Sequence, residues 1–368
     1  MEHHHSEAIR VPDVFLGGLG TAIPAFSMKQ STADRLLTRH YASELTPRAI
    51  DVMHKVLTHP SIRERHLSVS SIDELLSLKN ENPDKRIDRF VRWAVKLSAQ
   101  AARAALQKEG VAPGDISALV VNTCTGYVCP GIATYLIEEL GLPPETMAHD
   151  LVGSGCAGAV PNIKLATDLI AGKPDGIALS ISVEICSATF EMGNDISLIV
   201  SNAIFGDGAS AALLWHRPRG MRLVGSRCFC EPKYREDVRY VHRQGRLHNQ
   251  ISTKLPDVIG DLVPQFIERL LDEHQLQQHD IDYWAIHPGG MRMMDQIQQR
   301  LGLSDTDMYP TRETYARFGN MSSPTVLFAM DHIMNNGLKD GDRCLMVAYG
   351  AGLSIHGCIF QREDGFSG

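Results

Sequence analysis

The chain has 368 residues, of which 43% are hydrophobic and 21% charged; 36 Lys and Arg oppose 43 Asp and Glu, giving a formal charge of −7. This balance is typical of a globular protein and argues against a general nucleic-acid surface. No apolar run reaches the roughly 18 to 20 residues that cross a bilayer. The N-terminus, Met1–Ser6, does not resemble a signal peptide, and its three histidines are either native or left from a tag. We therefore expect a cytoplasmic protein whose partners include neither membrane nor nucleic acid.

Cysteine spacing argues against a metal site. Eight cysteines are present, and none forms the Cys-x-x-Cys pair that zinc sites commonly use. Several lie in apolar segments, where reduced thiols of a cytoplasmic protein are common. We expect no bound metal.

Strand-like and helical patterns alternate along the chain. The clearest helix is Arg86–Glu109, ended by Gly110, and another follows over Ala159–Ile170. The apolar face of the first comprises Ile87, Phe90, Val91, Ala94, Leu97, Ala101 and Ala105. Buried strands are predicted at Ala118–Cys124, Gly176–Val183, Ala209–Trp215, Tyr283–His287 and Arg343–Ala348. The basic run Arg217–Arg246 is interpreted as a solvated connection or partly ordered loop. Alternating strands and helices predict a layered α/β fold with largely buried sheets.

Two passages of the chain are alike. Gly126 to Leu140 and His287 to Leu301 both span 14 residues, and each is followed by a glycine-rich turn and a helix. We expect a duplicated fold with halves 1–217 and 218–368. Equivalent points of a duplicated fold lie near its pseudo-twofold axis. The duplication therefore predicts that Cys156 of the first half faces His287 and Asn320 of the second, up to 164 residues away.

Cys156 lies in the turn Gly-Ser-Gly-Cys-Ala-Gly, directly before the second helix. Unpaired backbone N–H groups and the positive end of the helix dipole both favour a thiolate there. Taken alone, a buried structural thiol is the more common interpretation. A nearby imidazole would make the cysteine a nucleophile.

His287 precedes Pro-Gly-Gly, a rigid turn that lets a ligand come close, and Asn320 follows Gly319. Each has an ordinary structural explanation, His287 as a packed ring and Asn320 as a helix cap. Together, an Asn amide and a neutral imidazole N–H could donate two hydrogen bonds to a developing oxyanion. Such a site supports acyl transfer to sulfur and the decarboxylation of a malonyl thioester to an enolate, which then attacks the acyl group. This chemistry requires no metal, flavin or nicotinamide.

The pattern resembles the chalcone and stilbene synthase family, the type III polyketide synthases of the thiolase superfamily, with the character of a bacterial member. The matching stretches, in order from about residue 10 to 360, begin at Gly18, Thr125, Gly155, Ile204, His287, Gly319 and Tyr349. The resemblance implies a five-layered αβαβα fold, a homodimer, and an acyltransferase that uses coenzyme A thioesters and no cofactor. An acyl-CoA starter would be loaded on Cys156 and extended with malonyl-CoA. The product would be cyclised in the same cavity, as a pyrone, resorcinol or phloroglucinol.

Carried over by position, the resemblance implies that Cys156 is the nucleophile and that His287 and Asn320 are the decarboxylation pair. It implies substrate or coenzyme A contacts at Phe205, Lys55, His59, Gly289 and Ser322. It implies a cavity lined by Cys124, Thr125, Cys129, Glu184, Thr189, Asn249 and Ala351, with Cys129 reaching across the dimer interface. Several of these residues differ from the plant enzymes, Ala351 standing for a proline, so a plant-type product is not expected.

Other activities fit less well. A ketoacyl synthase III would share the Cys-His-Asn set and perform a single condensation, but Met-Ser-Ser after Asn320 disfavours it. A thiolase would need a cysteine in the loop 348–354, which has none. A cysteine hydrolase wants Gly-x-Cys-x-Gly, whereas Ser154 occupies the first position. A scaffold subunit would usually lack one of the three candidate residues.

Overall fold

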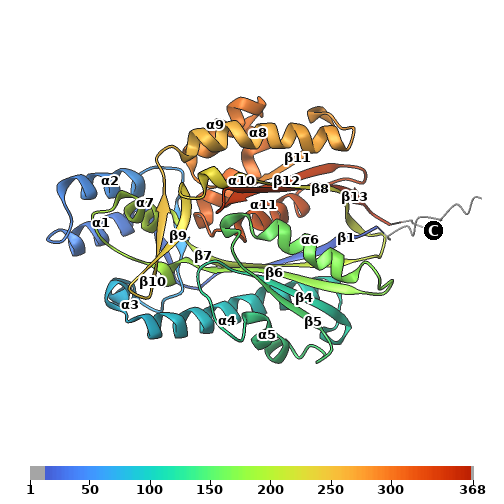
Figure 1. Cartoon of the computed structure of the whole chain (residues 1–368), viewed down its shortest axis with the longest axis horizontal. Helices are drawn as coiled ribbons and strands as arrows, with labels where there is room; N and C mark the ends of the chain where they lie inside the picture. The colour runs from blue at the N-terminus through green and yellow to red at the C-terminus, as the bar shows by residue number, and fades with distance from the viewer. Residues whose placement is uncertain (1–12, 366–368) are drawn as a thin grey trace, which may run out of the picture.

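The computed structural model describes residues 13–365, so the N-terminal histidine run lies outside the described residues. A mixed sheet runs through it in the order β11-β12-β13-β8-β1-β7-β6-β4-β5 (Figure 1). Its strands are β1 (Phe15–Ala22), β4 (Ile116–Asn122), β5 (Met147–Leu151), β6 (Ile177–Ile185), β7 (Asp207–Trp215), β8 (Gly220–Cys230), β11 (Tyr283–Ile286), β12 (Arg343–Gly350) and β13 (Ser354–Glu363). The two parts of this sheet meet where β1 pairs with β8 over two residue pairs, Phe15 with Arg222 and Leu16 with Met221.

The strand pairing repeats in the two halves. In the first, β1 and β6 are both antiparallel to β7, and β6 is parallel to β4. In the second, β8 and β12 are both antiparallel to β13, and β12 is parallel to β11. The duplicated fold predicted from the sequence is therefore confirmed. The expected boundary at residue 217 lies between β7 and β8, and its status as a domain boundary stays a prediction.

Helices make three layers around the two parts of the sheet (Figure 1). One outer layer holds α4 (Pro83–Glu109) and α5 (Ile132–Leu140), and the other holds α8 (Leu255–Glu273) and α9 (Met291–Leu301). Between the two parts of the sheet lie α6 (Ala159–Ile170) and α11 (Thr325–Met334), and α10 (Asp305–Phe318) packs on α11 and β11. These helices are amphipathic or apolar and bury aliphatic side chains against both parts of the sheet, which gives the αβαβα order.

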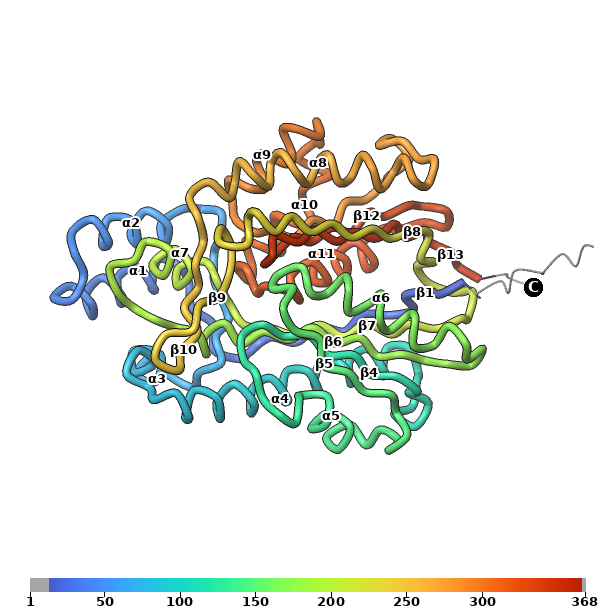
Figure 2. The backbone as a smooth tube through the Cα atoms, in the orientation of Figure 1, coloured from blue at the N-terminus to red at the C-terminus, as the bar shows by residue number. Residues whose placement is uncertain are grey.

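A smaller lobe lies at one end of the molecule, on the left of Figure 2. It contains α1 (Gln30–Tyr41), α2 (Pro47–Leu57), α3 (Ile72–Ser77), α7 (Ile196–Ile204) and the short pair β2 (Ser27–Lys29) and β3 (Glu64–His66). A separate hairpin, β9 (Val238–Arg243) and β10 (Arg246–Ile251), runs beside this lobe. Short 3-10 turns include η3 (Gly155–Ala157) and η4 (Cys186–Thr189); the others are η1 (Leu78–Asn80), η2 (Pro113–Asp115), η5 (Pro232–Tyr234) and η6 (Gln278–Asp280). None of the helices among residues 13–365 combines the length and apolarity that crossing a membrane requires.

Two sequence expectations are wrong in detail. The buried face of α4 begins with Arg86 and Arg89, whereas Ile87 is 38% exposed. The reason is that the start of α4 lies against η4, where Arg86 donates to the carbonyls of Ala188 and Phe190. The expected loop 217–246 instead forms β8 and β9, because β8 gains its partners from β13 and β1, both remote in sequence. Composition alone does not report such long-range pairing.

Candidate active site

Cys156 lies in the turn η3, directly before α6. The end of β12 packs tightly against this turn. A Cβ atom at Gly350 would lie 2.5 Å from the Ser154 carbonyl oxygen and 2.8 Å from the Cys156 nitrogen, so only glycine fits there. This close approach brings the second half of the fold to the cysteine.

His287 follows the last residue of β11. Its backbone N–H donates to the Val347 carbonyl at 2.9 Å, which continues the ladder between β11 and β12. The Thr311 hydroxyl holds Ile286, the residue before His287. It donates to the Ile286 carbonyl at 2.9 Å and accepts from the Ile286 N–H at 3.1 Å. The His287 side chain is buried, and neither ring nitrogen has a hydrogen-bond partner among the described residues. Both nitrogens are thus available to a ligand or to the cysteine.

Asn320 is held by its backbone beside Phe205. Its N–H donates to the Ile204 carbonyl and its carbonyl accepts from the Gly206 N–H, both at 2.9 Å. Its side-chain Oδ1 accepts from the Ser322 N–H at 2.7 Å, which turns the Nδ2 group toward the Gly289 carbonyl at 3.5 Å. The amide N–H groups therefore face the His287 turn.

These three side chains line one chamber of about 60 Å³. Of the residues expected at the site, the chamber is lined by Cys124, Cys156, Phe205, Asn249, His287, Gly289, Asn320, Ser322 and Ala351. Several further residues line the chamber without having been predicted from the sequence to belong to the site. They are Val238, Arg239, Tyr240, Ile251, Leu255, Ile259, Met293, Tyr349 and Leu353. Three of these residues, Val238, Arg239 and Tyr240, belong to the segment interpreted as a loop. Tyr349 stands in a matching stretch and could have been singled out there.

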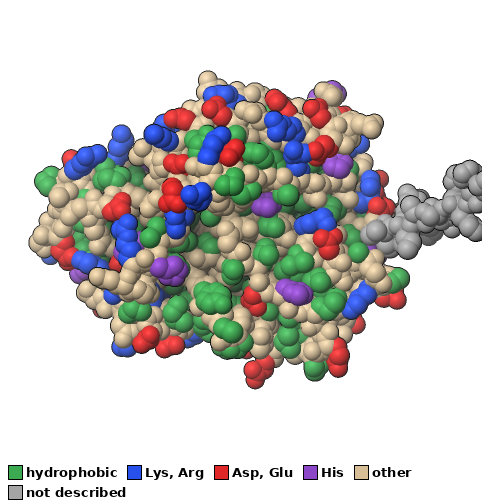
Figure 3. Space-filling model, in the orientation of Figure 1, with side chains coloured by type: hydrophobic (Ala, Val, Ile, Leu, Met, Phe, Trp, Pro, Cys, Tyr) green, Lys and Arg blue, Asp and Glu red, His purple; other side chains and the backbone are tan. Residues whose placement is uncertain are grey.

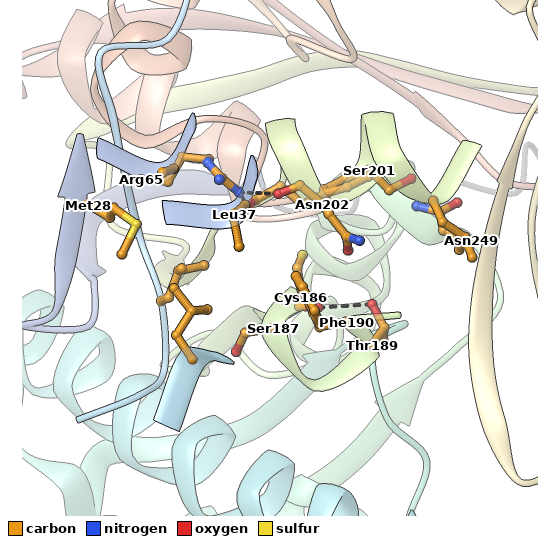
Figure 4. A pocket seen from close by; sticks show the side chains of 15 residues that line it. Met28, Leu37, Arg65, Cys186, Ser187, Thr189, Phe190, Ser201, Asn202 and Asn249 are labelled. Atoms are coloured by element: carbon orange, nitrogen blue, oxygen red, sulfur yellow. Dashed lines mark hydrogen bonds between the residues drawn. The ribbon is translucent and has the colours of Figure 1, made fainter. Parts of the chain in front are cut away.

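Two further cavities adjoin the chamber. One, of about 740 Å³, shares Cys124, Gly155, Arg239, Tyr240 and Ala351 with it and also contains Thr125. The other lies behind Phe205 and Asn249 and is shown in Figure 4. Its walls are mainly apolar, with Met28, Leu37, Leu67, Leu75, Phe190 and Leu198. Figure 4 also shows Arg65, which lines this cavity and donates to the Asn202 carbonyl at 2.7 Å.

Burial decides the protonation of the central pair. It raises the pKa of Cys156 to about 12, although the backbone N–H and the Ser322 hydroxyl act in the opposite direction. It lowers the pKa of His287 to about 3. The backbone of the turn does act toward the thiolate, as expected, but in the free protein loss of solvation outweighs it. At neutral pH the chamber holds a thiol beside a neutral imidazole.

Glu184 is buried behind the chamber wall and does not line it. Its Oε2 accepts from the backbone N–H groups of Cys124 at 2.9 Å and Thr125 at 3.1 Å. Its Oε1 accepts from the hydroxyls of Ser322 at 3.3 Å and Ser323 at 2.8 Å. Burial raises the pKa of this carboxyl group, and the hydrogen bonds partly offset that effect. From behind the chamber wall, the carboxyl group thus links Cys124 to Ser322, two residues that line the chamber.

Four expected residues lie elsewhere. Lys55 is exposed on α2, and His59 is exposed just beyond it, where its ring contacts the Ser61 hydroxyl at 2.9 Å. Cys129 is exposed and lines none of the cavities described above. Thr189 lines the apolar cavity behind Phe205 instead of the chamber. The roles expected of these residues stay predictions.

Comparison with known proteins agrees with this geometry. Residues 20–224 match the family described as FAE1/Type III polyketide synthase-like protein, and residues 237–362 match the C-terminal domain of chalcone and stilbene synthases. The 3,5-dihydroxyphenylacetyl-CoA synthase of Streptomyces toyocaensis is 27% identical over 94% of this chain and 89% of its own length. The α-pyrone synthesis polyketide synthase-like Pks18 of Mycobacterium tuberculosis is 27% identical over 94% of this chain and 90% of its own.

The fold is similar to that of solved relatives. The crystal structure of 1,3,6,8-tetrahydroxynaphthalene synthase from Streptomyces coelicolor superposes with a TM-score of 0.89 at 23% identity, covering 95% of this chain and all of the other. These matches support the polyketide synthase interpretation over a ketoacyl synthase III with a single condensation. The chain belongs to the type III polyketide synthases, the chalcone and stilbene synthase family, and is an acyltransferase that works by decarboxylative condensation.

Proposed function

We propose that Cys156 carries the acyl chain while His287 and Asn320 activate malonyl-CoA. The single observation that carries this proposal is that the three side chains, from three separate elements, line one small chamber. A neutral His287 can take the proton of the Cys156 thiol as the sulfur attacks the thioester carbonyl of a bound acyl-CoA, and it can return that proton to the departing coenzyme A thiolate. Because its ring nitrogens have no hydrogen-bond partner within residues 13–365, this transfer breaks none of the hydrogen bonds described there.

The extension step uses the same residues. Imidazole and amide N–H groups donate to the thioester carbonyl of malonyl-CoA and stabilise the enolate formed as carbon dioxide leaves. The enolate carbon attacks the acyl carbonyl on Cys156, a carbon–carbon bond forms, and the sulfur leaves. The chain, now longer by two carbons, is carried by coenzyme A and can be reloaded. No protein-bound cofactor enters this sequence.

The neighbouring cavities support the use of an acyl starter with an aliphatic part and repeated extension. The space behind Phe205, of about 30 Å³, is lined largely by leucine, methionine and phenylalanine side chains, which suit the end of a short alkyl group. The growing chain would extend into the cavity of about 740 Å³, since the chamber of about 60 Å³ is too small for it. Lys55 and His59 would meet the phosphates of coenzyme A outside the chamber.

We also propose that the active molecule is a homodimer. Tyr127 is 73% exposed and Val152 is 55% exposed, and both line the mouth of the larger cavity together with Ile87. Apolar side chains gather in the lower middle of Figure 3, and acidic side chains lie along the lower edge of that view. A surface of this kind is typical of a subunit interface.

The substitution Cys156→Ala tests the central proposal. The protein is incubated with a panel of acyl-CoA starters and malonyl-CoA, and products are identified by mass. We expect condensed products from the wild type and none from Cys156→Ala, because the variant lacks the sulfur that is proposed to carry the acyl chain. Cys228→Ala, at an exposed cysteine outside the chamber, is the control and should match the wild type. Condensed product from Cys156→Ala would contradict the proposal, and a single uncyclised condensation by the wild type would favour the ketosynthase alternative.

A further inference from the structure

Tyr349 is an aromatic residue that packs against the His287 turn. It stands near the end of β12, is 3% exposed and lines the chamber with Cys156, His287 and Asn320. Its ring meets the His287 ring edge-on, with centroids 5.4 Å apart and an interplanar angle of 80°. Its hydroxyl accepts a hydrogen bond from the Gly289 N–H at 3.2 Å.

The contact between Tyr349 and Gly289 is tight. A Cβ atom at Gly289 would lie 2.7 Å from the Tyr349 ring and 2.9 Å from its hydroxyl. The Gly289 N–H has one other acceptor, the His287 carbonyl at 3.0 Å, two residues back along the chain. The Gly289 N–H is therefore shared between this carbonyl, in a three-residue turn, and the phenol oxygen at 3.2 Å. The hydroxyl therefore anchors the turn that follows the candidate histidine.

The same turn holds the Asn320 amide. The Gly289 carbonyl accepts from Asn320 Nδ2 at 3.5 Å, while the opposite end of the amide is tied to the Ser322 N–H at 2.7 Å. A contact of 3.5 Å is at the outer limit of a hydrogen bond, so a shift of a few tenths of an ångström would break it. Gly289 is thus the link through which Tyr349 reaches Asn320.

We propose that Tyr349 is a positioning residue for decarboxylation, acting through Gly289 to set the His287 ring and the Asn320 amide. This inference rests on the proposed function of that pair. Its hydroxyl is the essential group, because phenylalanine would keep the ring contact with His287 and lose only the anchor of the Gly289 N–H. The effect should appear in the rate of enolate formation and not in the binding of malonyl-CoA, since Tyr349 itself need not touch the substrate.

The test is a double-mutant cycle on malonyl-CoA decarboxylation, followed by acetyl-CoA release in the absence of a starter. We expect Tyr349→Phe to lower kcat by about five- to tenfold, the worth of one neutral hydrogen bond, with KM within about twofold of the wild type. In an Asn320→Ala background the same change should have a smaller effect, because only the His287 ring is left for Tyr349 to position. Thermal unfolding of each variant checks that the fold is intact.

Tyr315→Phe is the matched control. Tyr315 is buried in the same apolar cluster as Tyr349 but does not line the chamber, so its rate should equal that of the wild type. A Tyr349→Phe enzyme with unchanged kcat, or an equal rate loss in the Asn320→Ala background, would overturn the inference. A wild type that does not decarboxylate malonyl-CoA would instead contradict the proposed function, so the two failures are distinguishable.

Discussion

At the scale of single residues, Glu184 shows how burial sets the chemistry around the site. The carboxyl group is surrounded by hydroxyl, thiol and backbone N–H groups, and burial raises its pKa. Its Oε2 accepts from two backbone N–H groups, whereas its Oε1 faces only hydroxyl and thiol groups, which can also accept. A protonated carboxyl group can therefore place its O–H on the Oε1 side without leaving a donor unpaired.

Glu184→Gln should make the free energy of unfolding less dependent on pH. An acid whose pKa is raised in the folded state binds a proton there that the unfolded chain has released. It therefore stabilises the fold fully below its unfolded pKa, and this contribution falls as pH rises through the folded pKa. Glutamine does not titrate, so the variant loses no stability in this way as pH rises. Its free energy of unfolding should therefore increase relative to that of the wild type above pH 4.5. The gain should be about 1.4 kcal/mol for each unit by which the pKa is raised.

Urea unfolding of both proteins between pH 4.5 and 9 measures this difference. Glu313→Gln serves as the control, because Glu313 lies far from the chamber wall and pairs with Arg63 at 2.7 Å. That variant should show no rising advantage with pH. A constant difference between Glu184→Gln and the wild type over the whole range would contradict the prediction.

At the scale of elements, the hairpin β9–β10 connects the cavities. It contributes Arg239 and Tyr240 to both the chamber and the larger cavity, and Asn249 to the chamber and the apolar cavity. A two-stranded hairpin is marginally stable alone, so its position depends on contacts with the body. Arg246 supplies several of them, since it reaches Glu191 at 3.1 Å and the carbonyls of Lys79 and Glu81, and Ser197 of α7 adds a bond to the Ile251 N–H at 2.7 Å.

Arg246→Ala should loosen this hairpin more than the rest of the fold. Glu191 is nearly buried and would keep only Arg86, at 3.0 Å, while two backbone carbonyls would lose their donor. We expect a local loss of about 1 to 3 kcal/mol, seen as faster hydrogen exchange of the amides of residues 238–251. Arg243→Ala, at the exposed end of β9, should leave exchange unchanged. Equal protection of the hairpin in Arg246→Ala and the wild type would show that Arg246 does not anchor it.

At the scale of the whole molecule, exposed apolar side chains are the feature to explain. Tyr127 and Val152 follow β4 and β5 and lie at the mouth of the cavity of about 740 Å³. Large apolar groups at such a position are stable in water when a second subunit covers them. The site would then be closed on this side by the partner.

Val152→Asp should convert the proposed dimer to monomers. A charge buried at a subunit interface without a partner costs several kcal/mol, far more than the same charge on an open surface. Sedimentation velocity at micromolar concentration measures the change, and circular dichroism checks the fold. Tyr309→Asp is the control, since Tyr309 is 53% exposed on α10, away from this cavity. A wild type that sediments as a monomer, or a Val152→Asp protein that sediments like the wild type, would contradict the dimer.

Some features were predictable because they depend on near neighbours. Helix Ala159–Ile170 has the predicted bounds, and α4 ends at Glu109 before Gly110, whose φ of 65° suits a glycine. The repeat spacing led to Cys156, His287 and Asn320 as one group, and the structure places all three around one chamber. Glycine turns, apolar periodicity and repeat spacing are all visible in the sequence itself, so they can be recognised without tertiary contacts.

Tertiary structure decided the rest. Burial, and not the helix terminus, sets the pKa of Cys156, and burial depends on β12 and the hairpin, which lie far along the chain. The burial of Arg86 follows from carbonyls about 100 residues away, and the anchoring of Gly289 by Tyr349 spans 60 residues. Sequence by itself thus determined the family and the duplicated α/β fold, and it singled out Cys156, His287 and Asn320 as the candidate reacting residues. Solvation and hydrogen-bond partners came only with the fold, because both are set by atoms that the chain brings together from distant segments.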